Sequence, residues 1–397
     1  MAENKDKKVL NVPALRFPEF TEEWGKCKVS DLLDIYSTNS LSWEQLEYDT
    51  NAIMNLHYGL IHVGLPTMVN LTKDKLPNIK EGNMPKNFEL CKEGDVAFAD
   101  ASEDTNEVAK TVEFFNLAGK DIVCGLHTIH GRDNKNRTVI GYKGYAFSST
   151  AFHNQIRRIA QGTKIYSISS KNFSECYIGL PSKPEQTKIA TLLRLIDERI
   201  VTQNKIIEDL KKLKSAITDL LFHSIADAHT IRLGEIAHIT NGAGDVQDAN
   251  TEHQKDWYPF FDRSEELKWF PTYSFDKEAV IYAGEGQSFY PRYYNGKFAL
   301  HQRCYAITDF ASCIIPKYCY HFMNTLNSYF VRNSVGSTVP SLRMDIFQKV
   351  EIRLPPIPKQ QHICKIIDAF YTKLEVEQRG ISILQELKQF LLSQMFI

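Results

Sequence analysis

The chain has 397 residues, of which 43% are hydrophobic and 24% are charged, and its net charge is −1. This length allows two or three domains with their own cores, and the composition is typical of an ordinary soluble protein. The near-neutral charge excludes a uniformly basic nucleic-acid binder, so a basic surface would have to be local or supplied by a partner. No apolar run is long enough to cross a bilayer, and the N-terminus lacks the apolar core of a secretory signal. Eight cysteines without a disulfide-framework spacing predict a cytoplasmic location.

The first predicted element is an extended arm over residues 1–23, because Pro13 and Pro18 are incompatible with a helix there. A globular segment is expected to begin at Trp24. Residues 28–35 resemble residues 232–239, so a second globular segment is expected to open in the same way. The predicted parts are an arm (1–23), a first globular domain (24–172), a first helical segment (173–228), a second globular domain (229–346) and a second helical segment (347–397).

Each globular segment is predicted to contain two strands at corresponding places. The first strand follows a turn and covers residues 94–99 in one half and 278–283 in the other. A polar loop is expected after each, and then a second strand over residues 124–129 and 298–303. His127 and His301 lie 174 positions apart, which is also the spacing between the two helical segments.

A helix is predicted to follow the strands in each half. In the first half, Phe152, Ile156 and Ile159 recur at helical spacing and would form the buried face. In the second half, Pro316 suits a first helical turn, and the apolar face would consist of Phe322, Leu326, Tyr329 and Phe330. Gly162 and Gly336 are expected to end these helices.

Residues 184–222 and 358–396 carry the strongest periodic pattern in the chain. Residues alternately four and three apart are mostly apolar, which indicates a coiled-coil seam. The first seam is Ile189, Leu193, Ile196, Ile200, Gln203, Ile207, Leu210, Lys214, Ile217 and Leu221. The second is Ile363, Ile367, Phe370, Leu374, Glu377, Ile381, Leu384, Lys388, Leu391 and Met395. Because the polar interruptions recur at the same two places, the pattern predicts an internal repeat.

The short segment 223–228 between the first long helix and the second globular domain restricts the geometry. The second helix can pack along the first only by running back, so the pair is predicted to be antiparallel, with a globular domain at each end. From Ile189 to Leu221 the helix would rise roughly 48 Å. The predicted fold class is α+β: two similar globular α/β domains separated by two long antiparallel coiled-coil helices, with a pseudo-twofold repeat.

The candidate functional surface consists of polar loops that suit nucleic acid. Residues 284–297 interleave basic, aromatic and amide side chains; arginine can pair with guanine, and amides can pair with adenine. The hydroxyl-rich turns 162–167 and 336–341 could contact phosphates. In the first half the candidates are Arg132, Lys135, Arg137, Lys143, Arg157, Arg158, Lys164 and Tyr166. In the second half they are Gln287, Tyr290, Arg292, Tyr293, Tyr294, Asn295, Lys297, Arg303, Arg332, Ser337, Thr338 and Arg343. Similar loops occur on protein-binding surfaces, so a scaffold with protein-binding heads remains an alternative.

Motifs for catalysis and for metal binding are weak. Cys124, His127 and His130 have a three-residue spacing that can bind zinc, but Phe298 stands in the second half where Cys124 stands in the first, so no metal is predicted. No phosphate-binding loop of the G-x-x-x-x-G-K-[ST] type is present. Residues 354–357 lack the leading Asn or Asp of the tetrapeptide with which amino-methyltransferases hold a base. The chain is therefore predicted to be a non-catalytic reader.

The motifs together resemble the specificity subunits of type I restriction–modification systems. The resemblance rests on the opening segment 11–32, on the repeated helix entries 180–189 and 354–363, and on the two long helices, and it covers essentially the whole chain. It implies that the globular domains are target-recognition domains and that the helices are the conserved spacer regions. Each domain would read one half of an interrupted sequence in double-stranded DNA, and the helices would set the unread gap.

The resemblance also implies partners. The helices would dock two methyltransferase subunits, and two motor–nuclease subunits would join for cleavage. The chain itself would bind no cofactor, since S-adenosylmethionine, ATP and magnesium would be used by those partners. A methylation-only system would use a very similar subunit, whereas a self-contained DNA methyltransferase or nuclease is opposed by the missing motifs.

Overall fold

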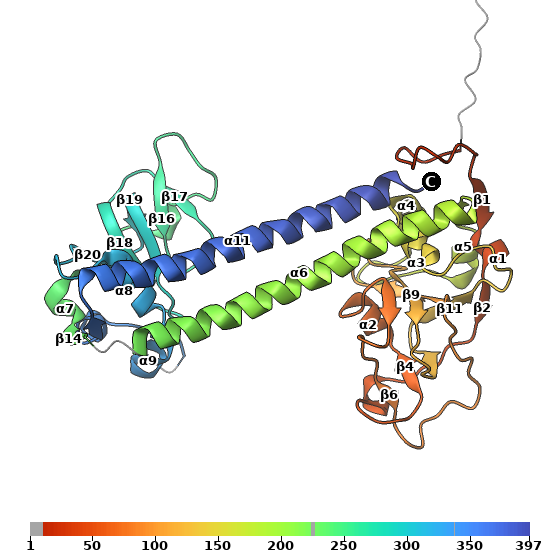
Figure 1. The fold of residues 1–397 in the computed structure, drawn as a ribbon, viewed down its shortest axis with the longest axis horizontal. Helices are drawn as coiled ribbons and strands as arrows, with labels where there is room; N and C mark the ends of the chain where they lie inside the picture. Colours follow the sequence, from red (N-terminus) through yellow and green to blue (C-terminus); the bar gives the residue numbers. More distant parts are fainter. Residues whose placement is uncertain (1–10, 224–226, 337) are drawn as a thin grey trace, which may run out of the picture. The chain divides into compact units, whose positions relative to one another are not determined.

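The structure is a computed structural model that describes residues 11–223, 227–336 and 338–397. The chain divides into two compact units, and Figure 1 labels their elements. Unit 1 comprises Met1–Asn204 and Arg379–Ile397, and unit 2 comprises Lys205–Gln378. Each unit therefore contains one globular domain and a part of both long helices. Among the described residues, no helix combines the length and the apolarity that crossing a membrane requires.

Unit 1 is built from short strands and helices that precede the first long helix. Its strands are β1 (Gly25–Lys28), β2 (Asp34–Tyr36), β3 (Leu46–Glu47), β4 (Met54–Leu56), β5 (Met68–Asn70), β6 (Asn78–Ile79), β7 (Val96–Ala99), β8 (Ala101–Ser102), β9 (Thr111–Asn116), β10 (Ile122–Cys124), β11 (Thr128–Arg132), β12 (Tyr166–Ser167) and β13 (Tyr177–Leu180). Its helices are α1 (Val29–Leu32), η1 (Trp43–Gln45), α2 (Tyr58–His62), α3 (Tyr142–Phe147), α4 (Thr150–Ile159), α5 (Ser170–Ser174) and the start of α6 (Lys183–His223).

Unit 2 repeats this plan with fewer strands. Its strands are β14 (His229–Arg232), β15 (His238–Asn241), β16 (Tyr258–Phe261), β17 (Lys268–Phe270), β18 (Phe275–Ala283), β19 (Arg292–Leu300), β20 (Cys304–Thr308) and β21 (Glu351–Leu354). Its helices are α7 (Leu233–Ile236), η2 (Val246–Asp248), α8 (Pro316–Met323), α9 (Asn327–Asn333), α10 (Met344–Gln348) and the start of α11 (Ile357–Gln394).

The central sheets of the two units correspond in strand order over five strands, and β17 adds a sixth strand in unit 2. In unit 1 the order is β2-β11-β7-β9-β5, and in unit 2 it is β15-β20-β18-β19-β16-β17. The middle strands β7 and β18 are apolar and buried on both faces. Successive residues of β7 (Val96–Ala99) alternate between two apolar clusters, and residues 279–282 of β18 alternate in the same way. Unit 1 has a second sheet, of order β10-β4-β6-β3. Apolar side chains of this sheet contribute to two further small clusters.

A two-stranded ribbon leads into each long helix. β1 pairs with β13, and β14 pairs with β21, both antiparallel. In each ribbon, a backbone hydrogen bond joins the short helix after the first strand to the residue before the second strand. Val29 donates to Cys176, and Leu233 donates to Val350, both at 2.8 Å. The similarity of the two opening segments in the sequence therefore reflects the same local structure.

Two buried glutamines, Gln186 and Gln360, fix the start of the long helices in the same way. The side-chain oxygen of Gln186 accepts a hydrogen bond from the backbone of Val139, and its amide donates to Arg137 and Pro181. Gln360 makes the corresponding three bonds, with the backbone of residues 313, 315 and 355. A buried amide that makes three hydrogen bonds is costly to replace, which explains why this residue recurs.

The long helices α6 and α11 pack through the predicted seam. Every seam position is buried or half-buried. Within unit 1, Lys388 binds Asp197 at 2.6 Å. Within unit 2, Lys214 lies 4.1 Å from the ring centroid of Tyr371. Because a late residue of each helix meets an early residue of the other in both places, the helices are antiparallel, as predicted.

An aromatic residue at or just beyond the end of each long helix fills the core of the unit in which that helix ends. Phe396 packs on Tyr142 and Trp24 in unit 1, with ring centroids 6.0 and 6.4 Å apart. Phe222 packs on Tyr318 and Phe322 in unit 2, at 5.5 and 5.4 Å. Each globular core is therefore completed by the helix that began in the other unit.

The structure corrects several predicted elements. The strand expected over residues 124–129 is two strands, β10 and β11, with a turn between them. The segment 284–297, expected to be a loop, contributes the first part of strand β19, which pairs with β18. The helix expected after Pro316 is divided into α8 and α9.

The equivalence of His127 and His301 is also wrong. Thr128 pairs with Ala99 at the end of β7, and Cys304 pairs with Ala283 at the end of β18. The sheet register therefore matches His127 with Arg303, since each lies one residue earlier. The constant spacing of 174 fails here by two residues because the connecting segments of the two domains differ in length.

Candidate nucleic-acid interface

In unit 1, a tight turn lies beside the segment that follows the central strand. Residues 161–167 fold back so that the backbones of Gln161 and Ser167 exchange two hydrogen bonds, of 3.0 and 2.9 Å. Strand β12 then pairs with β8, and Ile168 donates to the backbone of Asp100 at 3.0 Å. Gly162 has a φ of 144°, and a Cβ there would lie 1.9 Å from a backbone oxygen, so the turn requires glycine.

The same arrangement occurs in unit 2. Val335 and Ser341 exchange two backbone hydrogen bonds, of 2.9 and 2.8 Å. Leu342 donates to Gly284 at 2.7 Å, and this contact holds the turn against the segment that follows β18. Gly336 has a φ of 103°, so glycine is again favoured.

We call these two places the turn edges. The turn edge of unit 1 consists of residues 100–102, residue 127 and residues 161–167. The turn edge of unit 2 consists of residues 284–286, residue 303, residues 335–336 and residues 338–341. Backbone hydrogen bonds connect the strand ends in both: Asp100 donates to His127 at 3.1 Å, and Gly284 donates to Arg303 at 2.9 Å.

The turn edge of unit 1 presents a mixed polar and apolar surface. Lys164 is exposed, Tyr166 is half-buried, and Ile165 is 63% exposed although it is apolar. His127 binds the carboxylate of Asp100 at 3.1 Å. Arg157 and Arg158 lie on the last turn of α4, just before this edge.

The turn edge of unit 2 is more strongly polar. Arg303 is exposed and binds Glu285 at 2.8 Å. Gln287, Thr338 and Arg343 are exposed in the neighbouring segments. Arg332 is exposed on the last turn of α9, which precedes the turn. The predicted residue Ser337 lies outside the described residues.

An open cavity of about 590 Å³ adjoins Arg303 in unit 2. Its polar lining includes Gln247, Arg263, Gln302 and His301, none of which was among the predicted contacts. These residues come from three separate segments, and no periodic pattern or motif in the sequence connects them. Their guanidinium and amide groups are of the kinds that pair with base edges.

A buried ion pair supports the wall of this cavity. Asp262 accepts hydrogen bonds from Lys268 at 2.6 Å and from the hydroxyl of Ser264 at 2.6 Å. Burial by itself raises the pKa of Asp262, but these hydrogen bonds outweigh it and hold the pKa below its ordinary value. The carboxylate is therefore kept charged and anchors the segment that carries Arg263.

Two predicted DNA contacts, Arg132 and Lys143, are buried and are removed from the candidate surface. Arg132 binds Asp95 at 2.8 Å and Glu89 at 2.6 Å. Lys143 binds Glu113 at 3.2 Å. A buried cation paired with carboxylates cannot reach a phosphate without breaking its ion pairs, so both residues have a structural role.

Lys135 and Arg137 are exposed but lie away from the turn edge. Lys135 donates to the backbone of Asp31 at 2.8 Å. Both residues follow the end of β11, whereas His127 precedes its start. The length of this strand therefore separates them from the turn edge of unit 1.

The candidates on β19 are spread along the strand rather than gathered at one place. Arg292 pairs with Ile281 near the turn edge, whereas Lys297 pairs with Asp276 toward the other end, so that about 17 Å of strand separates them. Lys297 lies 4.6 Å from the centroid of the ring of Tyr273.

The remaining candidates on and before this strand differ in exposure. Tyr294 packs against Phe261, with ring centroids 5.3 Å apart, and the hydroxyl of Tyr293 binds Glu278. Asn295 is exposed, and Tyr290, in the loop before β19, is 57% exposed. Of this group, only Tyr290 and Asn295 offer largely free side chains, and Asn295 lies three residues beyond Arg292, farther from the turn edge.

Comparison with known proteins connects this arrangement to one family. The family model described as "Type I restriction modification DNA specificity domain" matches residues 74–212 and 226–389, which is well over half of the chain. The type I restriction enzyme EcoDI specificity subunit of Escherichia coli is 31% identical over 165 residues, which are 41% of this chain and 36% of that protein. The MjaIX specificity subunit of Methanocaldococcus jannaschii is 23% identical over 66% of this chain and 69% of its own length.

Solved structures show the same fold. The crystal structure of a type I restriction–modification S subunit from M. genitalium has a TM-score of 0.59 at 17% identity, and the match covers 97% of this chain and 99% of that one. A chain from a structure on complex assembly and conformational transition of the type I R-M system has a TM-score of 0.60 at 16% identity, over 93% and 96%.

Proposed function

The chain belongs to the type I restriction–modification DNA specificity family, and from this premise we propose that each globular domain reads one half of an interrupted sequence in double-stranded DNA. The chain is the non-catalytic reading subunit, and the chemistry is carried out by its partners. Because the EcoDI match spans only about a third of that protein, the detailed assignment below rests on the structure of this chain.

The observation that supports this proposal most strongly is the repetition of the turn edge with different side chains. In both units the same backbone hydrogen bonds hold a glycine-dependent turn against the strand end. The residue that meets the strand end is His127 in unit 1 and Arg303 in unit 2. A constant backbone with divergent side chains suits two domains that recognise different half-sites.

The chemistry of the turn edges fits both parts of DNA recognition. Hydroxyls and backbone N–H groups in the turns suit phosphates, which position a protein on the duplex. Arg303 and the amides of Gln287 and Gln302 suit guanine and adenine edges, which specify the sequence. Lys164 and the arginines that end α4 supply positive charge in unit 1. These charges are local, in keeping with the net charge of −1.

The outer faces of the long helices suit docking of partner subunits. Several apolar side chains on α6 and α11 point away from the seam and are exposed, among them Leu213 and Leu387, which occupy the same position in the two repeats. Exposed apolar residues grouped on one element are typical of protein interfaces. We assign these faces to two methyltransferase subunits, which use S-adenosylmethionine, and the complex with two motor–nuclease subunits uses ATP and magnesium.

The half-site assignment is tested by single-molecule sequencing of DNA from cells that express the chain with its methyltransferase subunit. The wild-type chain should direct methylation of an interrupted motif. Lys164→Ala should weaken or relax one half of the motif, and Arg303→Ala should do so for the other half. Loss of one base-reading pair corresponds to about 1–3 kcal/mol of discrimination.

Two exposed lysines at the far ends of the same sheets provide matched controls. Lys135→Ala in unit 1 and Lys277→Ala in unit 2 should leave the motif unchanged, because Lys135 follows the far end of β11 and Lys277 lies near the start of β18. The assignment is wrong if Lys164→Ala and Arg303→Ala affect the same half or neither half. Methylation that does not depend on the chain would instead favour a protein-binding scaffold.

A further inference from the structure

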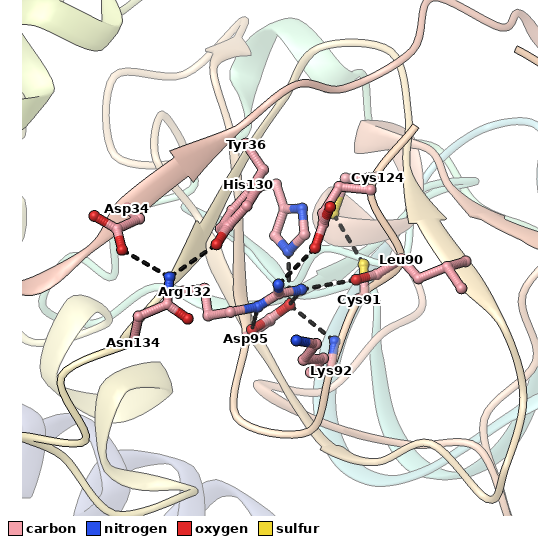
Figure 2. Close-up of polar contacts among 11 residues, drawn as sticks. Asp34, Tyr36, Leu90, Cys91, Lys92, Asp95, Cys124, His130, Arg132 and Asn134 are labelled. Carbon is pink, nitrogen blue, oxygen red and sulfur yellow. Dashed lines mark hydrogen bonds and ion pairs between the residues drawn. The ribbon is translucent and has the colours of Figure 1, made fainter. Parts of the chain in front are cut away.

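Two cysteines and a histidine of unit 1 converge in a buried cluster (Figure 2). Cys124 ends β10, His130 lies on β11, and Cys91 lies in the segment before β7. Potential ligand atoms of the three side chains all lie within 4.8 Å of one another. The backbone of Cys91 donates to Ile122 at 2.8 Å, so this cysteine is fixed against the second sheet.

The histidine at the centre of the cluster has one unused nitrogen. His130 is fully buried, and its Nδ1 has no hydrogen-bond partner. Its other nitrogen, Nε2, binds the carboxylate of Asp95 at 2.7 Å. A buried polar atom without a partner is uncommon in a folded protein, and a metal ion bound there would satisfy it.

The surroundings of His130 match those of a metal ligand. A carboxylate that binds the distal nitrogen of a ligating histidine fixes its orientation and raises its basicity. Asp95 is itself held by Arg132 at 2.8 and 2.9 Å and by the backbone N–H of Lys92 at 2.8 Å. Figure 2 shows this chain of contacts from Arg132 through Asp95 to the imidazole.

The spacing of the two sulfurs also fits a metal. The Sγ atoms of Cys91 and Cys124 are 3.6 Å apart. Two thiolates on a tetrahedral zinc ion, each about 2.3 Å from the metal, are separated by about 3.8 Å. A disulfide would require the sulfurs to approach to about 2.05 Å.

We propose that Cys91, Cys124 and His130 bind a zinc ion in unit 1. The cysteines would bind as thiolates and release their protons to solvent, and His130 would bind through Nδ1. Among the described residues the cluster offers three ligands, so a water molecule completes a tetrahedral set. Two thiolates balance the charge of the ion, and the Asp95–Arg132 pair adds no net charge.

The second unit shows that the fold does not need polar groups at this place. Cys124 corresponds to Leu300, because Cys124 pairs with Leu56 on the parallel strand β4 and Leu300 pairs with Phe261 on the parallel strand β16. The register of β11 and β20 matches His130 with Ala306, and Leu300 and Ala306 both belong to a buried apolar cluster. Apolar side chains pack the position in unit 2, whereas sulfur and imidazole groups occupy it in unit 1. The difference indicates a function particular to unit 1.

The sequence suggested a different set of ligands and no metal. His127, which shares the three-residue spacing, is exposed and binds Asp100. Cys91, which replaces it in the cluster, lies more than thirty positions before Cys124 and joins it only through the fold. A zinc ion here would connect the sheet containing β10 to the central sheet containing β11, and would be structural rather than part of the DNA surface.

The site is tested by metal analysis of the full chain, purified without a histidine tag and incubated with zinc before desalting. We expect about one zinc ion per wild-type chain and less than a tenth of that in Cys91→Ser and in His130→Gln. Cys319→Ser, which changes a buried cysteine in unit 2, should retain the wild-type content. Circular dichroism of each variant shows whether it remains folded.

A second measurement needs no variant. Cobalt(II) added to the reduced, metal-free wild-type chain should give thiolate-to-cobalt charge transfer and the intense visible bands of a tetrahedral site, and zinc should abolish both. The proposal is overturned if the folded wild-type chain binds neither ion. It is also overturned if Cys91 and Cys124 of the freshly purified chain form a disulfide instead, or if both variants keep their zinc.

Discussion

Single buried side chains define the repeat of this molecule more sharply than its surface does. Gln186 and Gln360 make the same three hydrogen bonds, and the sequence showed both residues at the same place in each half. Their function could not be predicted, because the backbone groups that they bind lie more than forty positions away, except for those of residues 181 and 355. The internal repeat of the sequence therefore identifies the two glutamines, whereas their backbone partners are seen only in the structure.

The sequence does not show which basic residues are buried and which are exposed. Arg132 and Lys143 lie among other basic residues and were assigned to DNA, yet each is buried against carboxylates. Their partners Asp95, Glu89 and Glu113 are distant in sequence, so no local pattern distinguishes these cations from exposed ones. Lys164, in contrast, lies in a glycine-dependent turn, and turns are usually on the surface.

The Asp262–Lys268 pair should make unit 2 sensitive to acid. A carboxyl whose pKa is lowered by folding stabilises the folded state above its unfolded pKa, and this contribution is lost as the pH falls through the folded pKa. The lowered pKa of Asp262 therefore predicts that part of the stability is lost below about pH 4. In Asp262→Asn, the urea unfolding midpoint should change less between pH 6 and pH 3 than in the wild type.

Asp256→Asn serves as the control for this measurement. Asp256 is exposed in the segment just before β16, so its replacement should leave the acid dependence as it is in the wild type. If the change of the urea unfolding midpoint between pH 6 and pH 3 decreases equally in both variants, the overall charge of the chain, and not the buried pair, determines the acid sensitivity.

At the scale of elements, the long helices were predictable and β19 was not. A coiled-coil seam repeats over many turns, so its period survives a few polar interruptions such as Lys214 and Lys388. Strand β19 begins with six residues, 292–297, that carry arginine, tyrosine, asparagine and lysine but little apolar alternation. Its pairing with β18, rather than its own side chains, makes this segment a strand.

The segment just beyond α11 should contribute strongly to the stability of unit 1. Phe396 is 6% exposed and packs on Tyr142 and Trp24. Phe396→Ala should lower the free energy of unfolding by about 3–5 kcal/mol, because it leaves a cavity in the core. Urea denaturation followed by tryptophan fluorescence measures this loss.

Phe390 offers a matched comparison, since it lies six residues earlier, on α11, and is 54% exposed. Phe390→Ala should change the free energy of unfolding by about 0.5 kcal/mol or less. If the two substitutions cost the same, Phe396 does not hold the core of unit 1 together.

At the scale of the whole molecule, the two domains are joined by α6, by α11 and by the short segment between α6 and β14. If the helices set the distance between the half-sites, a seven-residue insertion in each should lengthen the unread gap. Seven residues add about 10.5 Å of helix, which corresponds to about three base pairs. Insertions after Gln203 and before Gly380 keep the seam in register.

The sequencing experiment described above measures the gap of this variant. A three-residue insertion in each helix serves as the comparison, because it rotates the seam out of register and should abolish methylation rather than change the gap. A motif with an unchanged gap in the seven-residue variant would show that the helices do not set the spacing.

The packing of Phe396 in the core of unit 1 has a consequence for how the protein folds during its synthesis. Tyr142 leaves the ribosome early, but Phe396, which covers it, is added 254 residues later (396 − 142). At about 5–20 residues per second, the first domain waits on the order of 10–50 s with this part of its core open. The nascent first domain therefore exposes apolar surface to chaperones until Phe396 has been added, and loss of residues 379–397 would leave unit 1 incomplete while unit 2 keeps all of its residues.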